Sequence, residues 1–315
     1  MGLFRRSRKA DDAEAAPDET FEFLNRRQAA RVRELARQGF AELGVETVIR
    51  PDHLVGADGT VYGLASLMAA CLHVDRGERE WPGLVHRHCR SLVDAMAEDV
   101  DASQLPAEEM LARVYLRVVG VSTLPHEWRD WYRYGRLITD ELVELLFLDS
   151  PNSLRSLRQE DVDAFGADVL RRAGLENLLR EPVDSVESFD CGEGARAAVV
   201  LGESVYTASR ILVLPDLLRR VYGERSYPNG VVVGVPFRHQ VVLHPVDSRA
   251  VIPAIQTMAD FVHAGFTDGV GSVCPYLFWW RDGDLRQLTF PGDDGGLVVR
   301  CDQDLTAVLN RLFDE

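Results

Sequence analysis

Apolar residues recur along the first half of the chain with two different spacings. Helical spacing predicts amphipathic helices, and short runs rich in β-branched and aromatic residues predict strands. The predicted helices are residues 21–43, 66–73, 82–96 and 161–179, and the predicted strands are residues 45–50, 61–64, 113–119 and 141–148. A mixed helical and β-containing N-terminal half is therefore expected.

The second half shows a regular order of predicted elements. Strands are predicted at residues 197–201, 231–235, 240–245, 275–281 and 285–290, and helices at 207–222, 249–266 and 304–313. The order β-α-β-β-α-β is typical of a split-βαβ, ferredoxin-like sheet with its helices on one side. The fold class expected is α+β, with a ferredoxin-like C-terminal half whose helices pack on a mostly antiparallel sheet.

Two segments interrupt these patterns. Residues 1–19 mix charges of both signs with little apolar surface, which predicts a disordered tail. Residues 181–194 are acidic and carry two glycines, which favours a linker. The chain is therefore divided into a tail (1–19), an N-terminal α+β domain (20–180) and a C-terminal α+β domain (195–315).

Charge and composition exclude several classes of protein. With 35 basic and 50 acidic residues the formal net charge is −15, which repels phosphate backbones, so no nucleic-acid partner is expected. No apolar stretch approaches the ~18 residues of a membrane span, and no apolar core follows the basic start of the chain. The five cysteines contain no C-x-x-C pair, which argues against a disulfide framework. A cytoplasmic location is expected.

Polar side chains follow two of the predicted strands of the second half. Ser209 and Arg210 come after the strand 197–201, and Arg238 and His239 come after the strand 231–235. If these strands lie in one sheet, the four side chains meet at one of its ends and form a polar corner.

This corner allows two interpretations. Ser209 is a nucleophile if His239 lies within hydrogen-bond reach and Asp247 or Asp216 orients the imidazole. The G-x-S-x-G elbow of α/β-hydrolases is absent, however. In the other interpretation Ser209 bonds the backbone and Arg210 binds a carboxylate, so that both stabilise the corner.

The same segments are similar to a known family. Residues 206–212 read Tyr-Thr-Ala-Ser-Arg-Ile-Leu, and residues 235–240 read Val-Pro-Phe-Arg-His-Gln. Shorter blocks match at residues 113–115, 122–125, 177–178 and 182–183. Together they resemble the YtpQ-like family of uncharacterised bacterial proteins. The resemblance implies an α+β fold and a bacterial cytoplasmic setting, and it brings no reaction.

Aromatic residues gather in two places among arginines. These groups are Trp128, Trp131, Tyr132 and Tyr134, and Phe278, Trp279 and Trp280. Core packing accounts for most such residues, but Trp, Tyr and Arg also dominate protein–protein interfaces. The two groups are the clearest indication of binding in the sequence.

Residues of metal-ligating type do not form a recognised pattern. Cys71, His73, His86 and Cys89 lack the spacing of a zinc site, and the acidic turn 292–296 lacks the spaced ligands of a calcium loop. No phosphate-binding or dinucleotide-binding fingerprint is present. Neither a metal nor another cofactor is expected.

The function expected is therefore that of a non-enzymatic protein-binding or regulatory module. Its expected contact surface consists of Tyr206, Ser209, Arg210, Arg238, His239, Trp279 and Trp280. A hydrolase that uses Ser209 and His239, or a sensor of a small ligand, is the alternative. A protein is the expected partner, whereas nucleic acid and membrane are not.

Overall fold

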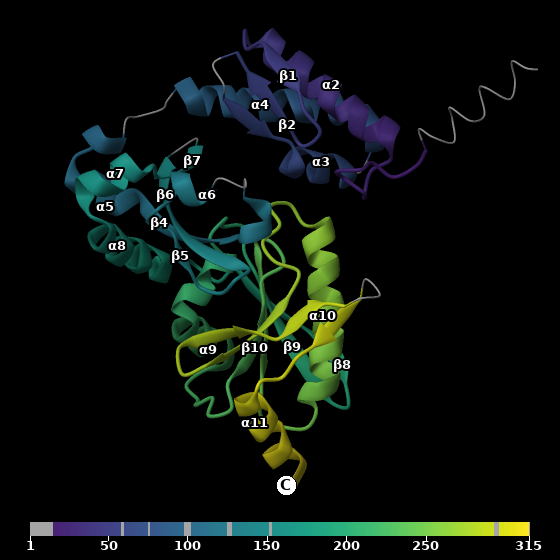
Figure 1. Cartoon of the computed structure of the whole chain (residues 1–315), viewed down its shortest axis with the longest axis vertical. Helices are drawn as coiled ribbons and strands as arrows, with labels where there is room; N and C mark the ends of the chain where they lie inside the picture. The colour runs from purple at the N-terminus through teal and green to yellow at the C-terminus, as the bar shows by residue number, and fades with distance from the viewer. Residues whose placement is uncertain are drawn as a thin grey trace, which may run out of the picture. The chain divides into compact units, whose positions relative to one another are not determined.

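The computed structural model describes residues 15–57, 60–74, 76–97, 102–124, 128–150, 153–292 and 296–314. The fold is mixed α+β with antiparallel sheets, which confirms the expected class. The chain divides into two compact units (Figure 1). Unit 1 is Met1–Val100 with Pro151–Ser153, and unit 2 is Asp101–Ser150 with Leu154–Glu315. This division lies near Val100, not in the segment 181–194.

Unit 1 packs helices against a three-stranded antiparallel sheet. The strands are β1 (Thr47–Ile49), β2 (His53–Gly56) and β3 (Val61–Gly63), and the helices are α2 (Arg26–Glu42), α3 (Ala65–Leu72), η1 (Gly77–Arg79) and α4 (Trp81–Ala97). A capping box begins α2, because Asn25 accepts from the Gln28 N–H at 2.9 Å and the Gln28 side chain accepts from Asn25. Phe40, Leu54 and Trp81 lie in its core.

The start of unit 1 corrects the predicted tail. Asp18 is 8% exposed, and its two carboxylate oxygens accept hydrogen bonds from Arg33 at 2.8 and 2.9 Å. Pro17 also forms a bridge with Asn25. Residues 15–19 therefore belong to the fold, and the prediction of a tail over residues 1–19 is wrong for them. Residues 1–14 lie outside the described part.

Unit 2 begins with a four-stranded sheet in which β6 pairs with β4, β5 and β7. The strands are β4 (Val114–Gly120), β5 (Arg136–Leu137), β6 (Leu142–Ser150) and β7 (Ser153–Ser156), and the helices around them are η2 (Ala102–Gln104), α5 (Ala107–Arg113), η3 (Val121–Thr123), α6 (Trp128–Trp131), α7 (Gln159–Phe165) and α8 (Ala167–Arg180). The helix predicted at 161–179 is interrupted at Gly166, whose φ of +87° ends α7.

The second sheet of unit 2 has six strands in the order β13-β12-β10-β11-β9-β8, all paired antiparallel. They are β8 (Ser185–Gly192), β9 (Ala195–Leu201), β10 (Val231–Gly234), β11 (Gln240–Pro245), β12 (Leu277–Arg281) and β13 (Asp284–Gln287). The predicted linker at 181–194 is therefore wrong, because β8 pairs with β9 along its length. A small ribbon, β14 (Thr289–Pro291) and β15 (Leu297–Val299), follows.

Helices cover both faces of this sheet (Figure 1). The segment η4 (Ala208–Val213) and α9 (Leu214–Tyr222) pack on one face, and α10 (Val251–Asp268) and α11 (Gln303–Asp314) pack on the other. The connection from β9 to β10 passes over β11, and the connection from β11 to β12 passes over β10, in the same direction across the sheet. Because β9 and β11 run antiparallel to each other, right-handed crossovers place the helices of the two connections on opposite faces. The ferredoxin-like arrangement with helices on one side is not confirmed.

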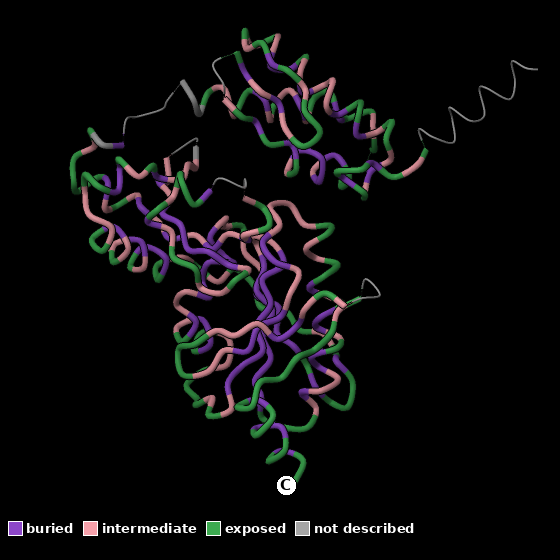
Figure 2. The backbone as a smooth tube through the Cα atoms, viewed as in Figure 1, coloured by how far each residue is buried: buried purple, intermediate pink, exposed green. Residues whose placement is uncertain are grey.

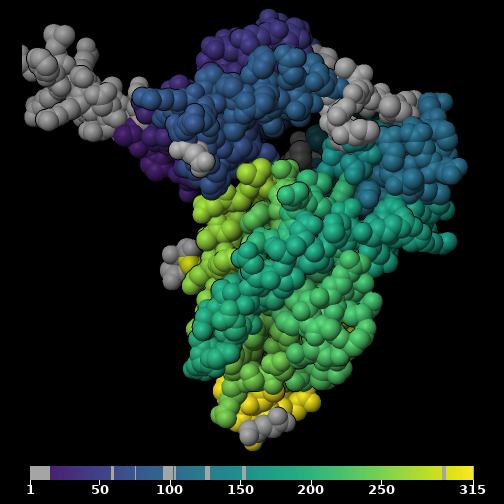
Figure 3. Space-filling model, turned by 180° about the vertical axis from the view of Figure 1, so that it is seen from behind, coloured from purple at the N-terminus to yellow at the C-terminus, as the bar shows by residue number. Residues whose placement is uncertain are grey.

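The interior of the six-stranded sheet is mostly apolar, with Gln240 and His244 of β11 as buried polar side chains. Each residue of β10 is buried, and buried positions concentrate in the central strands (Figure 2). In the space-filling view the teal, green and yellow segments of unit 2 form one continuous surface (Figure 3). The end of β4 and the segment that leads into β12 approach each other at Gly120, where a Cβ atom would lie 1.8 Å from the carbonyl oxygen of Val273. Only glycine fits there.

Candidate functional site

Ser209 lies in η4 and bonds the backbone of the first sheet. The side chain is 1% exposed, and its hydroxyl accepts a hydrogen bond from the N–H of Val118 at 3.0 Å. β4 is an edge strand, so this bond satisfies a buried N–H that no neighbouring strand reaches. Among the described residues, Ser209 shares no hydrogen bond with His239.

Arg210 is 0% exposed and bonds three oxygens. Its guanidinium donates to the carbonyls of Glu181 and Pro182 and to the Asp216 carboxylate, the last at 3.1 Å. Arg210 therefore joins the end of α8 to α9. These contacts support the structural interpretation of the corner. Since Ser209 and Arg210 are both buried, their expected place on a contact surface is wrong.

The second aromatic group is also largely internal. Trp279 is buried against α10, and its indole N–H donates to the carbonyl of Asn229 at 2.9 Å. Trp280, its neighbour in β12, points to the other face and is partly buried there. Trp279 is therefore a core residue and not a contact residue.

Arg238 and His239 do meet in the turn between β10 and β11. The Nε of Arg238 donates to Nε2 of His239 at 2.9 Å, and Nδ1 of His239 lies 3.0 Å from the Gly202 carbonyl. Both contacts are satisfied when the imidazole is neutral with its proton on Nδ1. Burial, followed by the charge of Arg238, lowers the pKa of His239, which favours this form.

The hydrolase constellation is not assembled in the described part of the chain. Asp247 pairs with Arg225 at 3.0 Å, and Asp216 pairs with Arg210 and with Arg220, at 3.1 and 2.8 Å. Neither carboxylate is bonded to His239. No triad geometry therefore supports Ser209 as a nucleophile.

Arg117, which the sequence reasoning missed, belongs to the same corner. It lies on β4 on the same side as Tyr115, and its guanidinium carbon is 5.2 Å from the centre of the Phe147 ring. Burial and the charge of Arg238 lower the pKa of Arg117 to about 10. The sequence offered one signal, a charged residue inside a run of β-formers. The side chain of such a residue is rarely buried, even in part, unless a partner or a function accounts for it.

Tyr206 connects Arg117 to the corner. Its ring stacks on that of Tyr115 with centroids 4.2 Å apart, and the Ala208 N–H, two residues on, donates to the carbonyl of Arg238 at 3.0 Å. The buried Tyr206 hydroxyl makes no hydrogen bond of normal geometry within the described ranges. Burial and the charge of Asp149 raise the pKa of Tyr206, whereas Arg117 lowers it, so the phenol lies between opposite charges.

A cavity of about 620 Å³ lies beside the first aromatic group. It is lined by residues of α6, β7 and α7 and by their flanking turns: Asp130, Trp131, Tyr132, Arg133, Arg155, Ser156, Arg158, Gln159, Glu160 and Asp163. Trp131 is 50% exposed, and the Tyr132 hydroxyl lies 2.8 Å from Oγ of Ser156. Trp128 and Tyr134 are buried, so only part of this aromatic group faces solvent.

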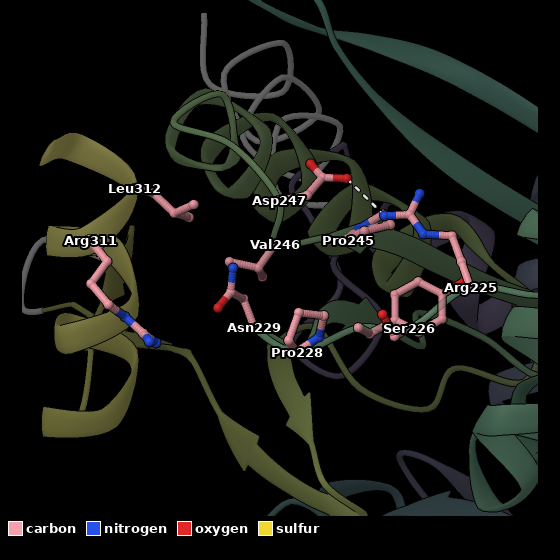
Figure 4. A pocket seen from close by; sticks show the side chains of 11 residues that line it. Arg225, Ser226, Pro228, Asn229, Pro245, Val246, Asp247, Arg311 and Leu312 are labelled. Carbon is pink, nitrogen blue, oxygen red and sulfur yellow. Dashed lines mark hydrogen bonds and ion pairs between the residues drawn. The ribbon is translucent and has the colours of Figure 1, made fainter. Parts of the chain in front are cut away.

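A second cavity, of about 300 Å³, lies where β10 begins and β11 ends. Figure 4 shows Asn229 and Pro228 on one side, Arg311 and Leu312 of α11 on another, and the Arg225–Asp247 ion pair at its rim. The pair neutralises the charges of both side chains.

Cys71 and Cys89, two of the residues of metal-ligating type, lie in the core of unit 1. Burial raises the pKa of Cys71 to about 12 and that of Cys89 to about 11, which disfavours the thiolate that binds zinc. The described residues contain no group of three His, Cys, Asp or Glu side chains placed for a metal. Residues 293–295 of the acidic turn lie outside the described part.

No helix of the described part has the length and apolar character needed to cross a membrane. Comparison with known proteins adds no assignment: no protein-family model matches the chain, and no match was found among curated proteins or solved structures.

Proposed function

We propose that this protein acts by binding a protein partner, and that the cavity beside Trp131 is part of the contact surface. The observation that carries the proposal is the exposure of Trp131. Of the five tryptophans in the chain, it is the one whose side chain is exposed, at 50%, and it lines a cavity. An exposed indole in a hollow is the usual anchor of a protein interface.

The surroundings of Trp131 support this role. Arg133 and Arg158 line the same cavity and are exposed, and no ion pair with a carboxylate occupies them in the described ranges. Arg155 is instead paired with Asp161 at 3.3 Å. A partner segment that places an apolar side chain on Trp131 and a carboxylate near Arg133 fits this surface.

A cytoplasmic location is part of the proposal. All five cysteines are free, and four of them are buried. Free thiols are typical of proteins that remain in a reducing compartment. The resemblance to the YtpQ-like family agrees with such a setting.

The test compares Trp131→Ala with the wild type in affinity capture from the native lysate, followed by calorimetric titration of the recovered partner. Phe313→Ala is the matched control, since Phe313 is 52% exposed on α11, away from this cavity. We expect the partner to be lost with Trp131→Ala and retained with Phe313→Ala, with equal melting temperatures. Equal capture by both variants would disprove the proposed surface.

A further inference from the structure

Arg117 and Arg238 are two half-buried arginines without a carboxylate partner. In the part of the chain that the structure describes, neither forms an ion pair, whereas Arg210 nearby is paired with Asp216. Backbone contacts bring their segments together: the hydroxyl of Ser209 accepts from the N–H of Val118, next to Arg117, and the Ala208 N–H donates to the carbonyl of Arg238. The charge of Arg238 also lowers the pKa of Arg117. Like charges that lie close together and partly out of water disfavour each other unless an anion neutralises them.

Arg238 is held in one orientation. Its backbone N–H donates to the Gly271 carbonyl at 3.0 Å, and a Cβ atom at Gly271 would lie 2.7 Å from Cδ of Arg238. The bond from Nε to His239 fixes the guanidinium further and leaves its two terminal amino groups for another acceptor. The side chain is therefore preorganised.

Arg117 and Tyr206 complete the surroundings. The Arg117 guanidinium lies over the Phe147 ring, an arrangement that leaves the N–H donors at its edge without an acceptor among the described residues. Tyr206 is 2% exposed, and its hydroxyl lies between the charges of Asp149 and Arg117.

We infer that Arg117 and Arg238 bind a small oxyanion, either a phosphate group or a carboxylate group. Guanidinium groups match the planar pairs of oxygens in both anions. The net charge of −15 repels extended polyanions, so the site suits a single anionic group on a small molecule. Both arginines remain partly exposed, which gives such a ligand access from solvent.

The test is calorimetric titration of the full chain with inorganic phosphate and, separately, with acetate, at constant ionic strength in chloride. We expect one site, which Arg117→Gln and Arg238→Gln each weaken on the order of tenfold or more. The control Arg219→Gln removes an exposed charge that is already paired with Asp216 and Glu224, and should bind like the wild type. Tighter binding of phosphate or of acetate identifies the anionic group. No binding of either anion by the wild type overturns the inference.

A second measurement separates binding from a structural role. Without added anion, Arg117→Gln should melt at or above the wild-type temperature, because it removes repulsion from Arg238; phosphate should raise the melting temperature of the wild type only. A lower melting temperature for Arg117→Gln in anion-free buffer would show that Arg117 serves the fold, and would contradict the inference. Trp131→Ala should leave phosphate binding unchanged, so this site and the partner surface can fail independently.

Discussion

Arg210 in η4 and the pair Arg117–Arg238, from β4 and the turn between β10 and β11, belong to segments that are bonded to one another, yet their surroundings differ. Arg210 donates to two carbonyls and to Asp216, and its side chain is entirely buried. Arg117 and Arg238 are partly exposed and lack a carboxylate in the described ranges. The first arginine has its partners within the fold, and the other two depend on something outside it. Position in the sequence alone does not distinguish these roles.

The largest expected effect tests the paired arginine. Arg210→Ala should lower the free energy of unfolding by about 3 kcal/mol, because it removes a buried group that bonds three oxygens and leaves their space unfilled. Urea unfolding measures it. Arg219→Ala is the matched control: Arg219 contacts the same Asp216 at 3.4 Å but is 53% exposed, and should cost less than about 0.5 kcal/mol. Equal losses would mean that the buried contacts of Arg210 are not what stabilises the corner.

Unit 1 contains another paired arginine, Arg33, whose effect should be smaller. Its bonds lower the pKa of Asp18 from 3.8 to about 2. A carboxyl group whose folded pKa is lowered adds stability above its unfolded pKa and loses it as the pH falls through the folded one. Asp18→Asn should therefore cost about 2 kcal/mol at neutral pH, and the difference should disappear as the pH falls from about 4 toward 2.

Unfolding of unit 1, followed between pH 2 and 7, checks the Asp18 prediction. Glu19→Gln is the control, because the carboxylate of Glu19 pairs with Arg26 while 85% exposed, and its loss should change little. A cost for Asp18→Asn that does not depend on pH would point to packing instead of charge.

Ser209→Ala should produce a loss of about 1 kcal/mol, because the buried N–H of Val118 loses its acceptor. Phosphate binding should remain, which separates this residue from the anion site. Thermal unfolding and titration of one preparation give both values, with Ser188→Ala as an exposed control. If Ser209→Ala unfolds like the wild type but loses a hydrolytic activity, the structural role assigned to Ser209 is wrong.

The smallest expected effect concerns His239. Because its pKa is lowered in the folded protein, the unfolded chain takes up the proton first, so stability falls as the pH drops below the ordinary histidine value of 6.5. The loss should stay under about 1 kcal/mol, and His239→Gln should remove it. Unfolding of both proteins at pH 7.5 and 5.5 measures the difference. A variant with the same dependence on pH as the wild type would assign the titration to another group.

Local pattern predicted most elements of unit 2 because their apolar faces repeat with the right period, as in α10 and β11. It failed at β8, an edge strand with a mostly exposed and acidic sequence that resembles a linker. Only pairing with β9 makes β8 a strand. Local pattern also predicted one continuous helix at 207–222, whereas the structure has the 3₁₀ helix η4 followed by α9, with the change close to Pro215.

The candidate site was foreseen only in part. The expectation that Arg238 and His239 share one turn follows from adjacency, and their hydrogen bond agrees with it. Arg117 was not foreseen, because more than a hundred residues separate it from Arg238 and nothing in its own strand indicates that the fold brings the two segments together. Trp131 and Trp279 also looked alike in sequence, although one is exposed and the other is core.

The sequence by itself determined the α+β class, most of the order of strands and helices after residue 195 and the acidic charge, since these depend on local periodicity and composition. The tertiary structure alone decided the strand order, the placement of helices on both faces, and the approach of the segments that carry Arg117 and Arg238. The reason is physical: pairing and burial join residues distant in sequence, and a side chain's role depends on the partners it meets there.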